Sequence, residues 1–103
     1  LMEIAMAAME YMIIHPKRAW ESQQGNALAR REKAKATKGC RIAIARGIRP
    51  KVMGEYGTVI GLIVEDEKGK PVAAGVRNVD GIQAKAHQIY SMTEEREWVE
   101  VQK

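Results

Sequence analysis

The chain has 103 residues, of which 46% are hydrophobic and 29% are charged, and its formal net charge is +4 at pH 7. This length fits one domain, and this balance excludes a chain that is disordered throughout. The single cysteine, Cys40, excludes an intrachain disulfide and favours a reducing compartment such as the cytoplasm.

The positive charge is concentrated in one central block. Residues 1–14 carry a net charge of −2, residues 15–54 carry +9 and residues 55–103 carry −3. A block of one sign attracts ligands of the opposite sign, so this asymmetry favours an anionic partner. The alternative is that these Lys and Arg side chains only keep an exposed helix and loop in solution.

The first predicted element is a helix over residues 2–14. Apolar side chains cover most of its circumference, and Glu3, Ala7 and Glu10 line the remaining stripe. The run LMEIAMAAMEYMII contains two acids and is too short to span a membrane. It also lacks the basic leader and the small-residue cleavage site of a signal peptide. We therefore expect a soluble, cytoplasmic protein.

Further helices are predicted before residue 39. Pro16 suits the first turn of a helix that carries Trp20, and Gly25-Asn26 marks either a break or a weak point in one long helix. The run NALARREKAKA, residues 26–36, is rich in strong helix formers. The character of the sequence changes at Gly39. These patterns predict a helical N-terminal segment, residues 1–38, and a β-rich part, residues 39–103.

Five short strands are predicted in the β-rich part. Residues 41–46 alternate with period two, and residues 57–64 form an apolar, β-branched run that is typical of a central strand. A charged hairpin turn at 65–70 leads to a strand over 71–77. Its inner face is expected to hold Val72, Ala74 and Val76.

The last two strands are predicted after a tight turn at residues 78–81. Residues 82–87 alternate again, with Ile82, Ala84 and Ala86 inward, and residues 98–101 form the final strand. Residues 89–95 between them are expected to form a turn or a short helical bend. Five strands with turn signals between them favour a small barrel over a βαβ arrangement.

The order of these features resembles the KOW element set in an SH3-like barrel. The matching residues are Gly39, Ile42 and Ile44, the pair Arg46-Gly47, and the run GEYGTV at residues 54–59. Proteins with this element occur among ribosomal proteins and NusG-type transcription elongation factors. With its helical start, the chain is also similar to small phage and bacterial KOW-like proteins. The resemblance implies an α+β fold in which N-terminal helices precede a five-stranded SH3-like β-barrel, and it implies binding to RNA or DNA.

The leading candidate for binding nucleic acid is the loop RGIRPK, residues 46–51. A basic cluster beside a strand end neutralises phosphates without sequence specificity. Lys33 and its neighbours on the predicted third helix extend the basic surface, and Tyr56, between two glycines, is placed to stack on a base. A solvated loop without a ligand is the alternative. The candidate contacts to RNA or DNA are Arg30, Arg31, Lys35, Lys38, Arg41, Arg46, Arg49, Lys51 and Tyr56.

The Met-rich first helix supports a hypothesis of a different class. A helix that is apolar over most of its surface must be buried, either on its own barrel or against another chain. Methionine adapts to varied partners, so the helix suits a protein-interaction or assembly module. The candidate partner-binding residues are Met6, Met9 and Ile13.

Enzyme chemistry finds little support in the sequence. His15 and His87 have no Cys, Asp or Glu partner at metal-ligand spacing. Cys40 at the start of a strand is typical of an inert, buried thiol, and Trp20 and Trp98 are expected to serve packing. No nucleophile or phosphate-loop motif occurs. We therefore expect no catalysis, no metal and no cofactor.

Overall fold

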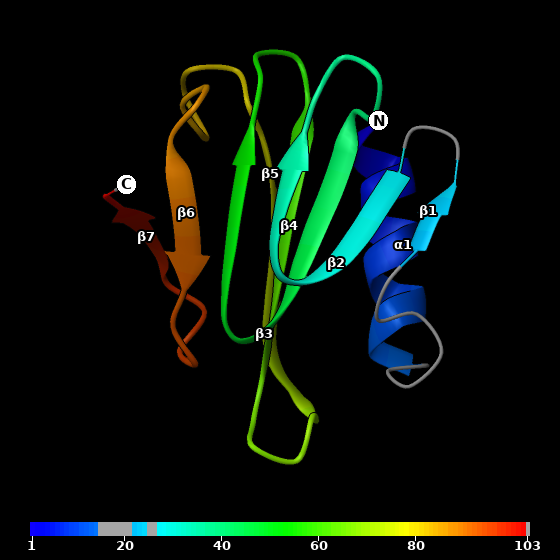
Figure 1. Ribbon diagram of the computed structural model, residues 1–103, viewed down its shortest axis with the longest axis vertical. Helices are drawn as coiled ribbons and strands as arrows, with labels where there is room; N and C mark the ends of the chain where they lie inside the picture. The colour runs from blue at the N-terminus through cyan, green and yellow to red at the C-terminus, as the bar shows by residue number, and fades with distance from the viewer. Residues whose placement is uncertain (15–21, 25–26, 103) are drawn as a thin grey trace.

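The computed structural model describes residues 1–14, 22–24 and 27–102 (Figure 1). Within these residues the chain forms a helix followed by a mixed β-sheet. The elements are α1 (Met2–Ile14), β1 (Ser22–Gln24), β2 (Ala27–Ala36), β3 (Ile42–Gly54), β4 (Val59–Glu65), β5 (Pro71–Asn78), β6 (Ile89–Met92) and β7 (Trp98–Val101). The predicted α+β class is confirmed.

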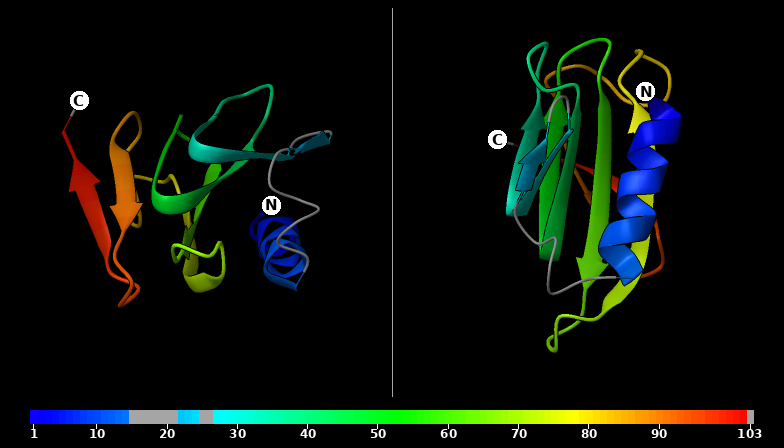
Figure 2. Two further views of the ribbon diagram at one scale, coloured as in Figure 1. Left: turned by 60° about the horizontal axis from the view of Figure 1, so that its bottom comes forward. Right: turned by 90° about the vertical axis from the view of Figure 1, so that its right-hand side faces the viewer.

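The sheet curls strongly because its two longest strands change direction partway along. Figures 1 and 2 show that β2 and β3 each run one way and then turn back. They pair in parallel, residues 27–31 with 42–46 and then residues 33–36 with 51–54, and the register shifts between the two stretches. Glu32, with a φ of 67°, stands at the bend of β2, and Gly47, with a φ of 151°, stands at the bend of β3. We call the two stretches of each strand its first and second arms.

The arms place the strands on two sides of half a barrel. The first arm of β3 pairs in parallel with β4, which pairs antiparallel with β5, and β1 pairs antiparallel with the first arm of β2. On the other side, Val52 in the second arm of β3 pairs with Tyr90 of β6, and β6 forms an antiparallel pair with β7. The sheet is therefore barrel-like.

The main core fills the inside of this curl. Ala43, Ile60 and Leu62 from one side share a buried cluster with Val52 and Tyr90 from the other. Each of these five side chains is less than 5% exposed. Both faces of β4 are buried, which explains why its sequence is a continuous apolar run and does not alternate.

Helix α1 covers the outer face of β4 and β5 (Figure 2). Its buried residues are Ala5, Met9 and Met12, at the spacing of one helix face. They form a second cluster with apolar residues of the sheet, among them Ile44 and Ile63. The predicted helix over residues 2–14 is confirmed, and it docks on its own sheet through one face.

The predicted helix over residues 26–36 is wrong, because residues 27–36 form β2. The run contains good helix formers, but pairing with β3 along both arms outweighs that intrinsic preference. Residues on either side of position 38 consequently belong to one sheet. The start of the predicted helix at Pro16, with Trp20, lies outside the described residues, as does the break at Gly25-Asn26. Residues 22–24, which that helix would include, form β1 because they pair with β2.

Several predicted strands are confirmed in the C-terminal part. β4, β5 and β7 correspond to the strands expected at 57–64, 71–77 and 98–101. The hairpin turn at 65–70 is also confirmed. Gly69 has a φ of 81°, and the Asp66 carboxylate accepts hydrogen bonds from the backbone N–H groups of Lys68 and Lys70, both at 2.9 Å.

Three expectations for this part of the chain are wrong. Residues 82–87 form no strand, because they have no partner strand beyond a bridge between Val79 and Ala84, and Ile82 is 92% exposed. Residues 89–92, expected in a bend, form β6 because they pair with β7. On β5, Val72 is 43% exposed, and Ala73 occupies the main core in its place.

Candidate functional site

A groove of about 500 Å³ lies along the second arms of β2 and β3. The cations that line it are exposed and its apolar side chains are partly or fully buried, so we call the former its rim and the latter its floor. We call it the basic groove. Its lining residues are Leu28, Arg30, Lys33, Ala34 and Lys35 of β2, Lys51, Val52 and Met53 of β3, Ile89 of β6, and Val101 and Gln102 at the end of the chain.

The register of β2 and β3 explains why cations meet here. Side chains alternate between the two faces of a strand, so Lys33 and Lys35 lie on the face opposite to Ala34, which is buried. Lys33 is the partner of Lys51, and Lys35 is the partner of Met53. Partners on adjacent strands point to the same face, so these four side chains form one outward-facing cluster.

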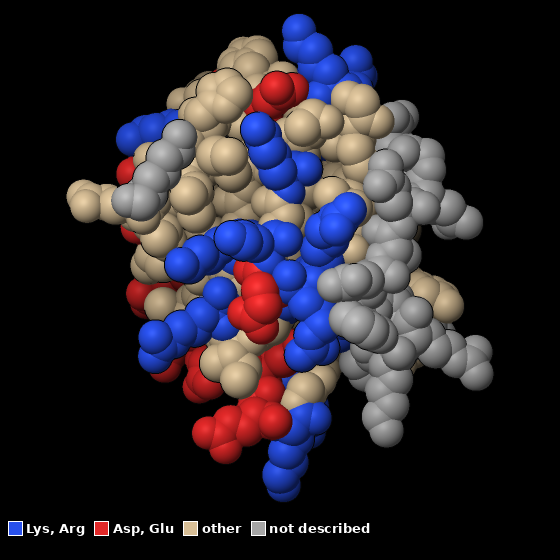
Figure 3. All heavy atoms as spheres, in the orientation of Figure 1, with Lys and Arg blue, Asp and Glu red and all other residues tan. Residues whose placement is uncertain are grey.

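The electrostatics of the groove favour an anion. The described residues that line it include Arg30, Lys33, Lys35 and Lys51 and no acid. All four side chains are exposed. Lys33 and Lys51 stand opposite one another on neighbouring strands, and like charges in that position destabilise a sheet. On the face seen in Figure 3, Lys and Arg side chains gather over β2 and β3, with some acidic atoms among them.

The acid of β2, Glu32, is turned toward the bend of β3. A Cβ atom placed on Gly47 would stand 2.9 Å from the Glu32 Oε1 atom. The φ of 151° at position 47 is one that L side chains rarely adopt, which explains why the residue is a glycine. The close approach places the Glu32 carboxylate against the bend and not among the groove's lining residues.

The structure brings together three of the residues predicted to bind nucleic acid, namely Arg30, Lys35 and Lys51. Lys33, which the sequence placed only in the wider basic surface, stands at the centre of the cluster. The signal that could have found it is the alternation K-A-K-A at residues 33–36, which is the period of a strand with one buried face.

Arg46 is not on the surface. Its side chain is 0% exposed, and its Nε and Nη2 atoms donate to Glu65 Oε2 at 3.0 and 2.6 Å. The loop expected at residues 46–51 is part of the continuous strand β3, so the prediction that Arg46 contacts phosphate from a loop is corrected. The second oxygen of Glu65, Oε1, is buried without a hydrogen-bond partner among the described residues.

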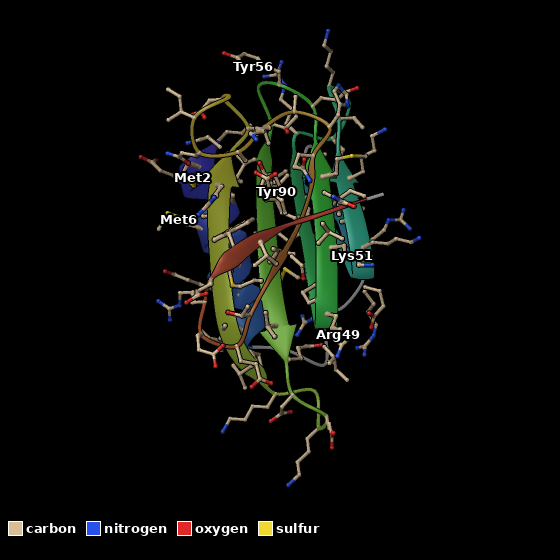
Figure 4. All side chains as sticks on the ribbon, turned by 90° about the vertical axis from the view of Figure 1, so that its left-hand side faces the viewer. Met2, Met6, Arg49, Lys51, Tyr56 and Tyr90 are labelled. Carbon is tan, nitrogen blue, oxygen red and sulfur yellow. The ribbon has the colours of Figure 1, made fainter. Side chains whose placement is uncertain are left out.

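The remaining predicted contacts lie apart from the groove. Lys38 and Arg41 are exposed near the turn between β2 and β3, where the Lys38 N–H donates to Glu55 Oε2 at 3.0 Å. Tyr56 is 70% exposed at one end of the molecule, whereas Arg49 lies toward the other end (Figure 4). Arg31 is exposed on the face of the first arm opposite to Arg30.

The predicted partner-binding residues of α1 divide between its two faces. Met9 is 6% exposed and packs in the core beneath the helix, whereas Met6 is 50% and Ile13 38% exposed. Ile4 and Ile14 are also exposed. Figure 4 shows Met2 and Met6 on the side of the sheet away from Lys51. The outer face of α1 and the basic groove are therefore separate surfaces.

Trp98 serves packing, as predicted. Its ring meets Tyr90 edge-on with centroids 6.1 Å apart, and the Arg77 guanidinium stands 4.8 Å above it. The Tyr90 hydroxyl accepts a hydrogen bond from the Lys85 N–H at 2.8 Å. The ring contact joins β6 to β7, and the Arg77 contact joins this pair to β5.

In the described part of the chain, two carboxyl groups have lowered pKa values, and both lie in turns. The Lys70 N–H lowers the pKa of Asp66, with a smaller contribution from the Lys68 N–H. The Gln83 and Ile82 N–H groups lower the pKa of Asp80. These shifts reflect turn structure.

Within the described ranges, no group of three or more His, Cys, Asp and Glu side chains is arranged to hold a metal ion. The same part of the chain contains no helix with the length and hydrophobicity that a membrane crossing requires. The chain matches no protein-family model, no curated protein and no solved structure.

Proposed function

We propose that this chain is a non-enzymatic binding module that contacts the phosphate backbone of RNA or DNA in the basic groove. The observation that carries the proposal is the pairing of Lys33 with Lys51 on adjacent strands, beside Lys35 and Arg30. Like charges in this position destabilise the free protein. A bound polyanion removes that repulsion and releases its own counter-ions.

Membership of the KOW family is a separate part of the proposal. The turn that opens β4 supports it, because Gly57 has a φ of 89° and the Thr58 hydroxyl donates to the Glu55 carbonyl at 2.6 Å. The barrel-like curl is compatible with an SH3-like barrel. The first arm of β3, however, pairs with β4 in parallel and forms no hairpin with it. The proposed function therefore rests on the groove and not on the family.

Charge reversal tests the groove directly. Binding of a fluorescein-labelled RNA and a labelled duplex DNA is measured by fluorescence anisotropy at low and at moderate salt. We expect wild-type binding that weakens steeply with salt, and at least ten-fold weaker binding by the Lys33→Glu/Lys51→Glu variant. The matched control is Lys68→Glu/Lys70→Glu, in the exposed hairpin turn between β4 and β5.

Two results would contradict the proposal. One is the absence of binding at low salt, where electrostatic association is strongest. The other is an equal loss of affinity in the groove variant and in the control variant, because general net charge would then explain the binding.

A second candidate function is a protein interaction through the outer face of α1. The observation that favours it is the exposure of Ile4 (60%), Met6 (50%) and Ile14 (71%) on a helix that is already docked through Met9. We expect Met6→Gln to abolish any self-association seen by sedimentation velocity and to leave stability unchanged. Met9→Gln is unsuitable as a test because it disrupts the core.

A further inference from the structure

We infer that the basic groove takes an unpaired strand, with phosphates at its rim and bases on its floor, in preference to a duplex. This inference rests on the proposed function and names the form of nucleic acid that the same site binds.

The first observation is the apolar floor beside the cations. Met53 stands beside Lys35 as its register partner, and Ile89 and Val101 are partners on the adjacent β6–β7 pair. All three are partly exposed. A site for phosphate alone needs no such floor, whereas a base offers a flat apolar face that covers it. Methionine is well suited to this contact because its thioether packs favourably on aromatic rings.

The second observation is the spacing of the rim. Lys33 and Lys35 are two residues apart on one face of a strand, so their Cα atoms are separated by roughly 6.4–6.8 Å. Lys51 faces Lys33 across the strand pair at roughly 4.8 Å. The separation along β2 is similar to that of successive phosphates in an extended single strand, so neighbouring phosphates meet neighbouring lysines.

The third observation is the size of the groove. A volume of about 500 Å³ is within the range of clefts that bind a small molecule, and a splayed base is of that class. In a duplex the bases are stacked inside and the phosphates lie on a convex cylinder. A duplex therefore reaches the rim but leaves the floor empty. Among the described residues that line the groove none is aromatic, so Met53 and aliphatic side chains take the place of ring stacking.

Three labelled probes of about twelve nucleotides, within the range of single-strand sites, separate the possibilities. They are an oligothymidylate, a strand of the same length without bases, and a duplex. We expect the oligothymidylate to bind at least ten-fold tighter than the other two at equal salt. In the Met53→Ala variant the difference in affinity between the oligothymidylate and the other two probes should be smaller. The salt dependence of binding should be the same as in the wild type.

Each other outcome overturns a defined part of the account. Equal affinity for the three probes, with a steep salt dependence, overturns the inference and leaves backbone binding intact. A labelled acidic peptide is measured beside the three probes, and tighter binding of this peptide than of any strand overturns nucleic acid as the ligand class. No binding of any probe at low salt overturns the proposed function as well. If Met53→Ala does not fold, as judged by circular dichroism, the comparison of the strands with and without bases decides the matter in the wild-type protein.

Discussion

The burial of Arg46 predicts that its replacement destabilises the protein strongly, whereas its position in a basic stretch of the sequence suggests a small effect. As a phosphate contact, Arg46 would be replaceable at little cost in stability. The structure instead places it at 0% exposure, with two hydrogen bonds to one oxygen of Glu65, which is 3% exposed. The Arg46→Met variant retains much of the side-chain volume and leaves the Glu65 carboxylate buried without this cation.

The size of the effect follows from that burial. Removing one partner of a buried ion pair costs about 3–5 kcal/mol, since an uncompensated charge remains. Replacing both partners by apolar residues removes the charge altogether, so we expect Arg46→Met/Glu65→Leu to recover most of the loss. Arg49→Met, the same substitution at an exposed position of the same strand, should change stability by no more than about 0.5 kcal/mol.

Urea unfolding followed by circular dichroism measures these differences. With a slope of about 1–3 kcal/mol per molar urea, a loss of 4 kcal/mol lowers the midpoint by roughly 1.3–4 M. A midpoint for Arg46→Met that equals that of Arg49→Met would refute the reasoning, because the buried pair would then contribute nothing. A double variant that is less stable than either single variant would equally contradict it.

Three further predictions concern the packing and the turns. Gly54→Ala should cost about 1–3 kcal/mol in urea unfolding, because a Cβ there would stand 2.9 Å from the Cγ2 atom of Ile60, and an unchanged midpoint would count against the packing at this turn. Met9→Ala should cost about 2–5 kcal/mol, because this side chain anchors α1 in the core, whereas Met6→Ala at an exposed site should cost little. The pKa of Asp80 is lowered on folding, so its contribution to stability is present above its ordinary value of 3.8 and is lost as the pH falls through the lowered value. The urea midpoint should therefore fall less steeply below about pH 4 in the Asp80→Asn variant than in the wild type. If the two proteins lose stability equally with falling pH, the turn does not stabilise the ionised carboxylate.

The sequence predicted those parts of the fold in which local pattern and final environment agree. The β-branched run at residues 57–64 became β4, because both of its faces are covered. The turn at 65–70 formed as expected because Asp66 and Gly69 carry its geometry themselves. Residues 2–14 formed a helix because Ala, Met and Glu favour one, and because Ala5, Met9 and Met12 on one of its faces are buried against the sheet.

β2 was missed because its composition and its environment disagree. Ala, Lys, Arg and Glu favour a helix when taken one at a time. The register that makes residues 27–36 a strand comes from β3, and the bend at Glu32 has no local signature. The only indication of a strand in the sequence of this segment is the alternation of Lys33 and Lys35 with Ala34, which the structure buries.

The sequence could predict that the site is basic, but not which charged residues stand next to one another. Charge counting located the positive block between residues 15 and 54. It did not show that Lys33 and Lys51 are register partners, because that depends on a parallel pairing of distant segments. Nor did it show that Arg46, unlike the basic residues near it, is buried in an ion pair, because its partner Glu65 comes from the end of another strand.

The most direct test of the proposed binding site is the salt dependence of single-strand binding in the Lys33→Gln/Lys51→Gln variant. Each phosphate contact on a single strand contributes about 0.7 to the slope of log K against log salt, so losing two contacts should reduce the slope by about 1.4. The control Lys68→Gln/Lys70→Gln, which neutralises two exposed lysines in the hairpin turn, should retain the wild-type slope. An unchanged slope in the groove variant would contradict the assignment of the basic groove as the phosphate-binding surface.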